Sequence, residues 1–292
     1  MTAAAPADDQ PPRRAWVLGG GGVIGVAWES GLAAGLSAGG VEVAADDVLV
    51  GTSAGAIVGV QLLHGRLPPD PRLNRPSDPP VDRSRLDVQA LGKIFTLWRA
   101  MEVTSPSQVA AIGAIVRDLD RSGEPLWIRS VEDTLGGSDW PEQRMLVVAV
   151  DIESGERRVF ERASGVAVAR AVAASSSVPG LLPAVEIEGR LYMDGQAHSS
   201  TNADLLLPLR PAQVLIVAPT NTHTGRGIGP HAARMLGLEV EALQQAGCSV
   251  LVITPSVEEA HHFGSNLMDP ARAGDAYDIG LQTGHAWAER LR

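Results

Sequence analysis

Short apolar runs without any charged residue recur along the chain, and most are followed by a segment of helical character. Strands that are buried on both faces read as continuous apolar runs, and their alternation with helices is typical of a parallel sheet covered on both sides. The sequence therefore predicts an α/β fold, a three-layer α/β/α arrangement around a central, mostly parallel sheet. The predicted strands are Ala15–Leu18, Val48–Val50, Met145–Val150, Gln213–Ala218 and Ser249–Thr254, with a strand pair at Val185–Met193.

The length of 292 residues and the apolar content of 45% are sufficient for one large domain. We expect residues 1–14 to form a disordered tail and residues 15–292 to form that domain. Residues 64–85 contain six prolines and many charges, so they read as an exposed insertion and not as helix or central strand. The predicted helices are Trp28–Leu36, Ala54–Leu63, Leu86–Leu119 with a break at Ser105-Pro106, Gly165–Ser175, Gly229–Ala246 and Ala271–Arg292.

The net charge of −10 argues against a nucleic-acid partner, because such proteins normally carry a basic surface. Cys248 is the only cysteine, so no internal disulfide can form, and a reducing cytoplasm is the simpler expectation. The first residues lack the apolar segment of a signal peptide, and no stretch reaches the ~20 apolar residues of a membrane span.

One serine stands between a predicted strand and a predicted helix, in the segment Gly51-Thr52-Ser53-Ala54-Gly55. Glycines on both sides of Ser53 remove the Cβ atoms that would block a sharp turn, and such a turn lifts the hydroxyl group above the edge of a sheet. Ser53 is therefore a candidate nucleophile. A turn of small residues that is needed only for strand–helix packing is the other interpretation.

The Gly-rich segment Leu18–Gly25 follows the first predicted strand. Backbone N–H groups at such a place can bind an anion. One use is an oxyanion hole for acyl transfer. Another is a dinucleotide site, since Gly20, Gly22 and Gly25 fit the G-x-G-x-x-G pattern. That pattern expects an acidic residue at the end of the next strand, whereas Asp47 comes before it, which weakens the nucleotide interpretation without removing it.

A serine nucleophile also needs a base. The chain order of α/β-hydrolases would allow His261, His262 or His285. Alternatively, Asp194 ends the predicted strand pair, and a carboxylate in a pocket poor in water is a better base because desolvation raises its pKa. An ordinary Asp-Gly turn explains the same dipeptide.

Taken together, these segments resemble the patatin-like phospholipase family over roughly residues 15–220. The match consists of three blocks in the right order and spacing, and no single block would be specific. The blocks are Gly20-Gly21-Gly22-Val23-Ile24-Gly25, Gly51-Thr52-Ser53-Ala54-Gly55 and Asp194-Gly195-Gln196, with Ala174–Gly180 and Val150–Gly155 also similar to the family. Within them, Gly25, Gly51, Gly55 and Gly195 support the motifs.

The resemblance implies a Ser53–Asp194 dyad without histidine. It also implies an oxyanion hole formed by the N–H groups of Gly20, Gly21 and Gly22. Expected substrates are acyl lipids or simpler carboxylic esters, with transient contact to a membrane surface, and neither a metal nor a cofactor is expected. For such a dyad, activity should rise with pH through one acidic ionisation, without an imidazole-like step near ~6.5.

Two positions depart from the family's pattern. Ile24 stands where the family usually has Arg or Lys, and Gln196 replaces a small residue after Asp-Gly. A relative that binds lipid without turnover is therefore an alternative, beside a histidine-dependent hydrolase and a nucleotide-binding protein.

Overall fold

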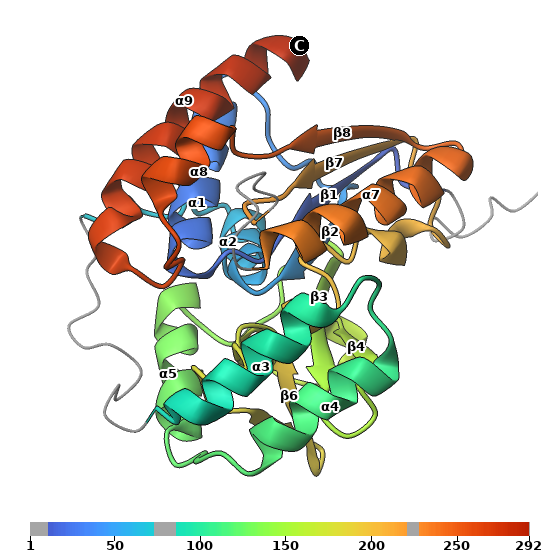
Figure 1. Cartoon of the computed structure of the whole chain (residues 1–292). Coiled ribbons are helices and arrows are strands. Elements are labelled where there is room, and N and C mark those ends of the chain that lie inside the picture. Colours follow the sequence, from blue (N-terminus) through green and yellow to red (C-terminus); the bar gives the residue numbers. More distant parts are fainter. Residues whose placement is uncertain (1–10, 73–85, 221–227, 292) are drawn as a thin grey trace, which may run out of the picture.

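The computed structural model describes residues 11–72, 86–220 and 228–291, and it shows one mixed sheet with helices on both faces (Figure 1). Five strands form a parallel central part, and three further strands pair antiparallel near β3. The prediction of a mostly parallel α/β/α fold is confirmed. In spatial order the parallel strands are β3 (Met145–Asp151), β2 (Val48–Thr52), β1 (Arg14–Leu18), β7 (Gln213–Val217) and β8 (Ser249–Ile253); the others are β4 (Arg157–Phe160), β5 (Val185–Ile187) and β6 (Arg190–Asp194).

Strand β3 has different neighbours along its length, and this arrangement positions the site. Val148 pairs with Thr52 of β2 and also with β4 on the other side. The next residue, Ala149, pairs with β4 and with Asp194 of β6. Strands β2 and β6 therefore occupy the same side of β3, end to end, and the last residue of each meets the other.

The residues of each central strand alternate between two apolar cores. Trp16 and Leu18 of β1 face the larger core, and Ala15 and Val17 face the second one. The larger core is covered by α1 (Gly22–Ala38), α2 (Ala54–Leu63), α5 (Glu124–Leu135), α6 (Val168–Ser175), α8 (Val257–Phe263) and α9 (Ala273–Leu291); the second is covered by α7 (Gly229–Gln245).

A third core lies under the helical pair α3 (Val88–Ala100) and α4 (Pro106–Arg117), which are side by side in front of β6 in Figure 1. The predicted break at Ser105-Pro106 separates these two helices, because Pro106 occupies the first turn of α4.

Helices α1 and α9 are in close contact through glycines. A Cβ atom added to Gly31 or Gly35 of α1 would overlap the backbone of α9, and one added to Gly280 or Gly284 would overlap the backbone of α1. The two helices can approach this closely only because none of these positions carries a side chain.

Several predicted boundaries differ from the structure. Helix α1 begins at Gly22 and not at Trp28, and α5, α8 and β4 were not predicted. Of the predicted tail, residues 1–10 lie outside the described part, and Arg14 already belongs to β1. Of the predicted insertion, residues 73–85 also lie outside it, and residues 64–72 contain neither helix nor strand.

Candidate active site

Ser53 occupies the turn between β2 and α2, in a backbone conformation that side chains rarely adopt, with φ 54° and ψ −117°. The neighbouring glycines are required by close packing. A Cβ atom on Gly51 would lie 2.7 Å from the Cα of Ala56, and one on Gly55 would overlap the carbonyl group of Leu18. This is the geometry of a nucleophile turn, in which the strained serine presents its hydroxyl group at the end of a strand.

Asp194 is the last residue of β6 and faces that hydroxyl group. Ser53 Oγ donates a hydrogen bond of 2.7 Å to Asp194 Oδ2. The other carboxylate oxygen, Oδ1, accepts from the Gln196 N–H at 2.8 Å, which fixes the rotation of the carboxylate. The end-to-end arrangement of β2 and β6 therefore brings together two side chains that are 141 positions apart in sequence.

Burial changes the pKa of the Asp194 carboxyl group. Asp194 is fully buried and Ser53 is 2% exposed. Desolvation raises the pKa of Asp194 to about 7, although the hydrogen bonds from Gln196 and Ser53 oppose the shift. At this pKa the predicted ionisation of the carboxyl group lies close to that of an imidazole, so its position in a pH profile does not distinguish the two groups.

The Gly-rich loop passes beside Ser53. A Cβ atom on Gly20 would lie 3.3 Å from Ser53 Cβ and 2.6 Å from Gln196 Oε1. The Gly20 N–H donates to the Ser200 carbonyl oxygen at 2.8 Å, so this amide is already used. The N–H groups of Gly21 and Gly22, at the start of α1, donate to no acceptor within residues 11–72, 86–220 and 228–291. Of the three predicted oxyanion donors, the amides of Gly21 and Gly22 are therefore the ones left without an acceptor among the described residues.

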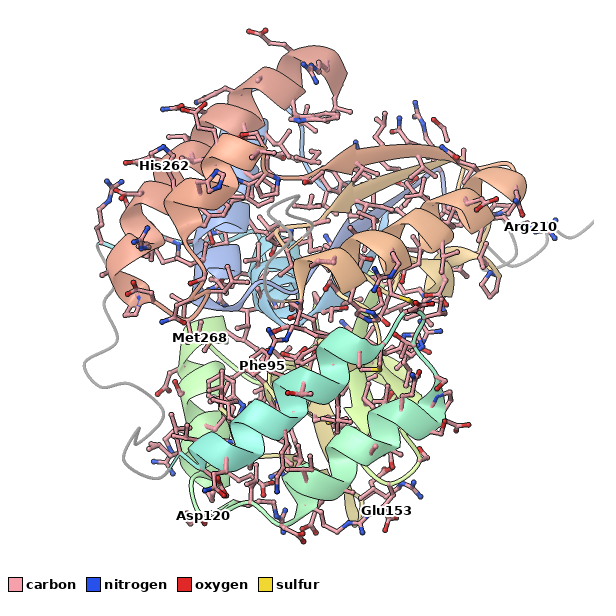
Figure 2. The ribbon with its side chains drawn as sticks, viewed as in Figure 1. Phe95, Asp120, Glu153, Arg210, His262 and Met268 are labelled. Carbon is pink, nitrogen blue, oxygen red and sulfur yellow. The ribbon has the colours of Figure 1, made fainter. Side chains whose placement is uncertain are left out.

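The loop is shaped by contacts with the C-terminal half of the chain. Gly22 has a left-handed φ of 61°, and a Cβ atom there would lie 2.8 Å from the Leu267 carbonyl oxygen and 2.9 Å from Met268 Sδ. The Ile24 N–H donates to the same Leu267 oxygen at 3.0 Å. Met268, labelled in Figure 2, therefore belongs to the segment that covers the start of α1.

The remaining motif glycines hold the turn and the loop together. A Cβ atom on Gly25 would lie 3.2 Å from Ala54 Cβ, and one on Gly195 would overlap the carbonyl group of Val148 while lying 3.2 Å from Thr52 Cγ2. The start of α1, the start of α2 and the end of β6 are consequently packed without space for side chains at these positions.

The structure shows which groups surround the two positions that depart from the family's pattern. Ile24 is buried in the larger core. Gln196 fills the space beside Gly20, and its Nε2 donates to Ser200 Oγ at 3.2 Å. Neither side chain interrupts the bond between Ser53 and Asp194.

Polar support around the dyad was not predicted. Ser175 Oγ accepts from the Ser53 N–H at 2.9 Å. Asn202, in a left-handed conformation, donates through Nδ2 to Thr52 Oγ1 at 3.1 Å and to the carbonyl oxygens of Ser199 at 2.7 Å and Gly195 at 3.4 Å. Asn202 thus connects the residue before Ser53 with the residue after Asp194. The Ser-rich stretch that contains Ser175 was noted in the sequence, but nothing there indicated Asn202.

The alternative bases are elsewhere. His261 and His262 lie exposed on α8, where Figure 2 labels His262, and His285 lies exposed on α9. Asp47, the acid nearest to the dinucleotide pattern, accepts hydrogen bonds from Arg14 and from Trp16 Nε1 at the start of β2. It is at the opposite end of that strand from the Gly-rich loop.

In the described part of the chain, no group of three or more His, Cys, Asp or Glu side chains is arranged to hold a metal ion. Likewise, none of the helices described there combines the length and apolar character needed to cross a membrane.

The family model for patatin-like phospholipase matches residues 16–207, which is more than half of the chain and includes both members of the dyad. No curated protein matches. Among solved structures, VipD from Legionella pneumophila is similar, with 11% sequence identity and a TM-score of 0.45, over 98% of this chain and 69% of VipD. On the match to the family model, the chain belongs to the patatin-like phospholipase family.

Proposed function

We propose that the chain hydrolyses acyl esters, either lipids or simpler carboxylic esters, with Ser53 as the nucleophile and Asp194 as its base. The observation that carries the proposal is the 2.7 Å hydrogen bond from Ser53 Oγ to a fully buried carboxylate. A serine hydroxyl group needs a base within hydrogen-bond distance, and no histidine fills that position in the described structure.

The reaction proceeds through an acyl-enzyme. Asp194 Oδ2 accepts the Ser53 proton while Oγ attacks the ester carbonyl carbon. The N–H groups of Gly21 and Gly22 stabilise the negative charge that develops on the carbonyl oxygen, and the positive end of α1 adds to this effect. As the tetrahedral intermediate collapses, the C–O bond to the leaving alcohol breaks and that alcohol takes the proton from Asp194.

Deacylation repeats the same steps with water. Asp194 accepts a proton from a water molecule that attacks the acyl carbon. The second intermediate then releases the carboxylic acid and returns the proton to Ser53 Oγ. Because Asp194 must be ionised at the start of each half-reaction, its pKa of about 7 favours activity at and above neutral pH.

The decisive experiment combines labelling with paired substitutions. A fluorophosphonate should form an adduct on Ser53 of the wild type and none on Ser53→Ala. Ser53→Ala and Asp194→Asn should each lower the hydrolysis of p-nitrophenyl esters by about three orders of magnitude. The double variant should be little worse, because the two groups act as a unit. Screening esters of increasing chain length against phospholipid vesicles would then define the substrate class.

His285→Gln, a substitution on the exposed face of α9, provides the control and should leave turnover unchanged. Additive losses in the double variant would contradict the dyad. An unlabelled Ser53, together with binding of lipid vesicles, would instead identify a relative that binds lipid without hydrolysing it.

A further inference from the structure

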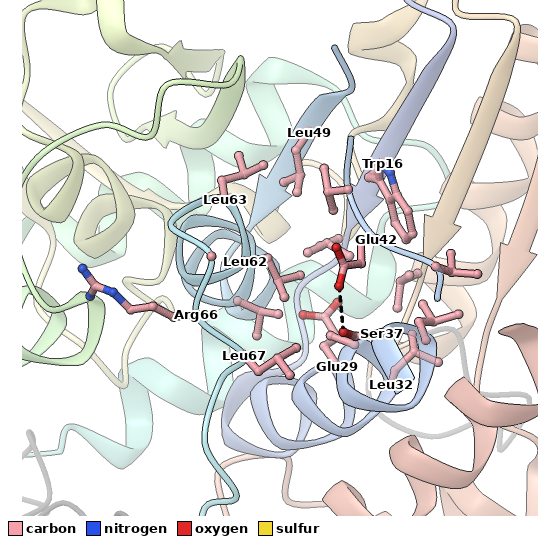
Figure 3. Close-up of a pocket in the computed structure, with 18 of the residues that line it drawn as sticks. Trp16, Glu29, Leu32, Ser37, Glu42, Leu49, Leu62, Leu63, Arg66 and Leu67 are labelled. Carbon is pink, nitrogen blue, oxygen red and sulfur yellow. Dashed lines mark hydrogen bonds between the residues drawn. The ribbon is translucent and has the colours of Figure 1, made fainter. Parts of the chain in front are cut away.

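A second site of interest lies away from the dyad, between α1, α2 and the sheet. It is a cavity of about 370 Å³, within the range of small-molecule sites. Neither Ser53 nor Asp194 lines it. Its walls are mainly aliphatic, and Figure 3 shows them around one common space; they include Leu32 and Leu36 of α1, Leu62 of α2, and Leu49 of β2.

The cavity opens at the edge of the sheet where the parallel strands begin. Its exposed lining residues are Glu42, which follows α1, and Gly65, Arg66 and Leu67, which follow α2. Ser53 lies at the other end of β2 and α2, so the mouth of the cavity and the candidate active site are on opposite edges of the sheet.

The inner part of the cavity contains a carboxyl group without a partner. Glu29, in the middle of α1, lines the cavity and is only 1% exposed. Neither Oε1 nor Oε2 has a hydrogen-bond partner among the described residues. Burial raises the pKa of Glu29 well above its ordinary value, and the nearby Gly19 amide opposes this shift without cancelling it. That amide donates to the Val217 carbonyl oxygen at 2.9 Å.

An unsatisfied buried carboxyl group is costly, so its presence inside an apolar cavity is a sign that something can bond to it. A partner that donates hydrogen bonds satisfies both oxygens, and a cationic donor does so most strongly. An alcohol satisfies the group less completely, since it offers one donor.

The charges at the mouth also select against anions. Glu42 contributes a second carboxylate, whose Oε1 accepts from Ser37 at 3.1 Å, and Figure 3 shows this bond. Arg66 is the one cation in the lining within the described residues, and its Nη1 is engaged with the Leu135 carbonyl oxygen at 2.6 Å. A carboxylate ligand, including a fatty-acid anion, would face two acids with little compensation.

We propose that this cavity is a binding site for a primary alkyl amine, with the ammonium group bonded to Glu29 and the hydrocarbon chain along Leu32, Leu49 and Leu62. At roughly 30 Å³ per non-hydrogen atom, the volume holds about a dozen such atoms, which fits an amine with a medium-length chain. The proposal does not depend on the hydrolase activity, since the two sites share no residue.

The test is isothermal titration calorimetry at pH 7.5 with three probes of equal chain length: n-octylamine, 1-octanol and sodium octanoate, each below its aggregation concentration. Wild-type protein should bind octylamine saturably at one site, about tenfold or more tightly than octanol, and should bind octanoate more weakly still. Glu29→Gln preserves the shape of the side chain but removes its ability to ionise, and with it the ion pair to the ammonium group. It should weaken octylamine binding by about tenfold and leave octanol binding within about twofold.

Two further variants keep the result interpretable. Glu239→Gln changes another buried glutamate, which accepts from Thr201 and from the Ala203 N–H far from this cavity, and it should bind all three probes as the wild type does. Ala33→Phe fills the cavity from α1 and should abolish saturable binding of both the amine and the alcohol. Circular dichroism would establish that each variant is folded.

Absence of saturable octylamine binding to the folded wild type would overturn the proposal. So would equal affinity for octanol or octanoate, or equal affinity of wild type and Glu29→Gln for octylamine. Unchanged binding to folded Ala33→Phe would also overturn it, because the amine would then bind elsewhere.

Discussion

Replacing Asp194 by Asn should abolish hydrolysis and yet make the protein more stable at alkaline pH. Desolvation raises the pKa of Asp194 from 3.8 to about 7, a shift of roughly three units, each worth about 1.4 kcal/mol. The folded state therefore holds the proton more tightly than the unfolded state does. The contribution of this group to stability is complete below pH ~4 and is lost as the pH rises to the folded-state pKa of about 7, at a cost of about 4 kcal/mol.

An asparagine side chain in place of Asp194 would avoid this cost without losing the hydrogen bonds of the site. Its Oδ1 can accept from the Gln196 N–H, as the aspartate oxygen does, and its Nδ2 can donate to Ser53 Oγ. We therefore expect Asp194→Asn to raise the free energy of unfolding by up to about 4 kcal/mol at pH 8.5 and by less than about 1 kcal/mol at pH 4.5. Other buried acids are present in both proteins, so their effects cancel in the difference.

The assay is urea unfolding followed by tryptophan fluorescence at both pH values. Asp151→Asn is the matched control, for which the expected change in the free energy of unfolding has the opposite sign. Although burial alone would raise its pKa, the Arg190 guanidinium and the N–H groups of Ser154 and Glu153 hold the pKa of Asp151 below its usual value. Asp151→Asn should therefore destabilise the protein at pH 8.5. An Asp194→Asn variant that is less stable than wild type at pH 8.5, or whose gain is the same at both pH values, would refute the reasoning.

Three further outcomes follow from the site. Gly20→Ala places a Cβ atom 2.6 Å from Gln196 Oε1 and should lower ester turnover by about tenfold or more in steady-state assays. Adding Gln196→Ala should restore most of the turnover, and failure of this rescue would contradict a clash between the two side chains. Asn202→Gly relieves the strain of a left-handed φ of 53° but removes the hydrogen-bond donor to Thr52, so kcat should fall by about tenfold with little change in KM. A change in KM alone would instead indicate a role in substrate binding. The pH profile of kcat/KM should show one ionisation near 7 with higher activity on the alkaline side, and His285→Gln should leave it unchanged. A shift of the ionisation in His285→Gln would indicate that a histidine is the base.

The sequence predicts those parts of the fold that depend on local signals. Central strands such as Met145–Asp151 are continuous apolar runs, and the Ser53 turn is marked by glycines, so both can be read from adjacent residues. Strand β4, Arg157–Phe160, was missed because its charged residues resemble a loop, and α5 was missed because its apolar positions are spread among polar ones. These elements are stabilised by tertiary packing, which local patterns record only weakly.

In the candidate site, too, residues marked by local motifs were predicted, whereas features that depend on distant segments were not. Ser53 and Asp194 were identified from their motifs, and the structure places them in contact. The direction of the Asp194 pKa shift was expected for a pocket poor in water. The occupied Gly20 amide and the size of that shift could not be predicted, because both depend on distant segments. The Gly20 amide is taken by the carbonyl group of Ser200, and the Asp194 pKa is raised to about 7 by full burial under the surrounding elements. The donor role of Asn202 likewise depends on a partner 150 positions away.

Through the glycine contact between α1 and α9, the candidate active site depends on residues outside the range that the family model matches. Helix α9, Ala273–Leu291, lies beyond residues 16–207, which the family model matches. It nevertheless fits against the side-chain-free surface of α1, the helix whose first turn carries the Gly21 and Gly22 amides. A protein trimmed to the matched residues would leave that surface open to water and α1 without its lateral support. The geometry of those amides therefore depends on a helix that no catalytic motif would have included.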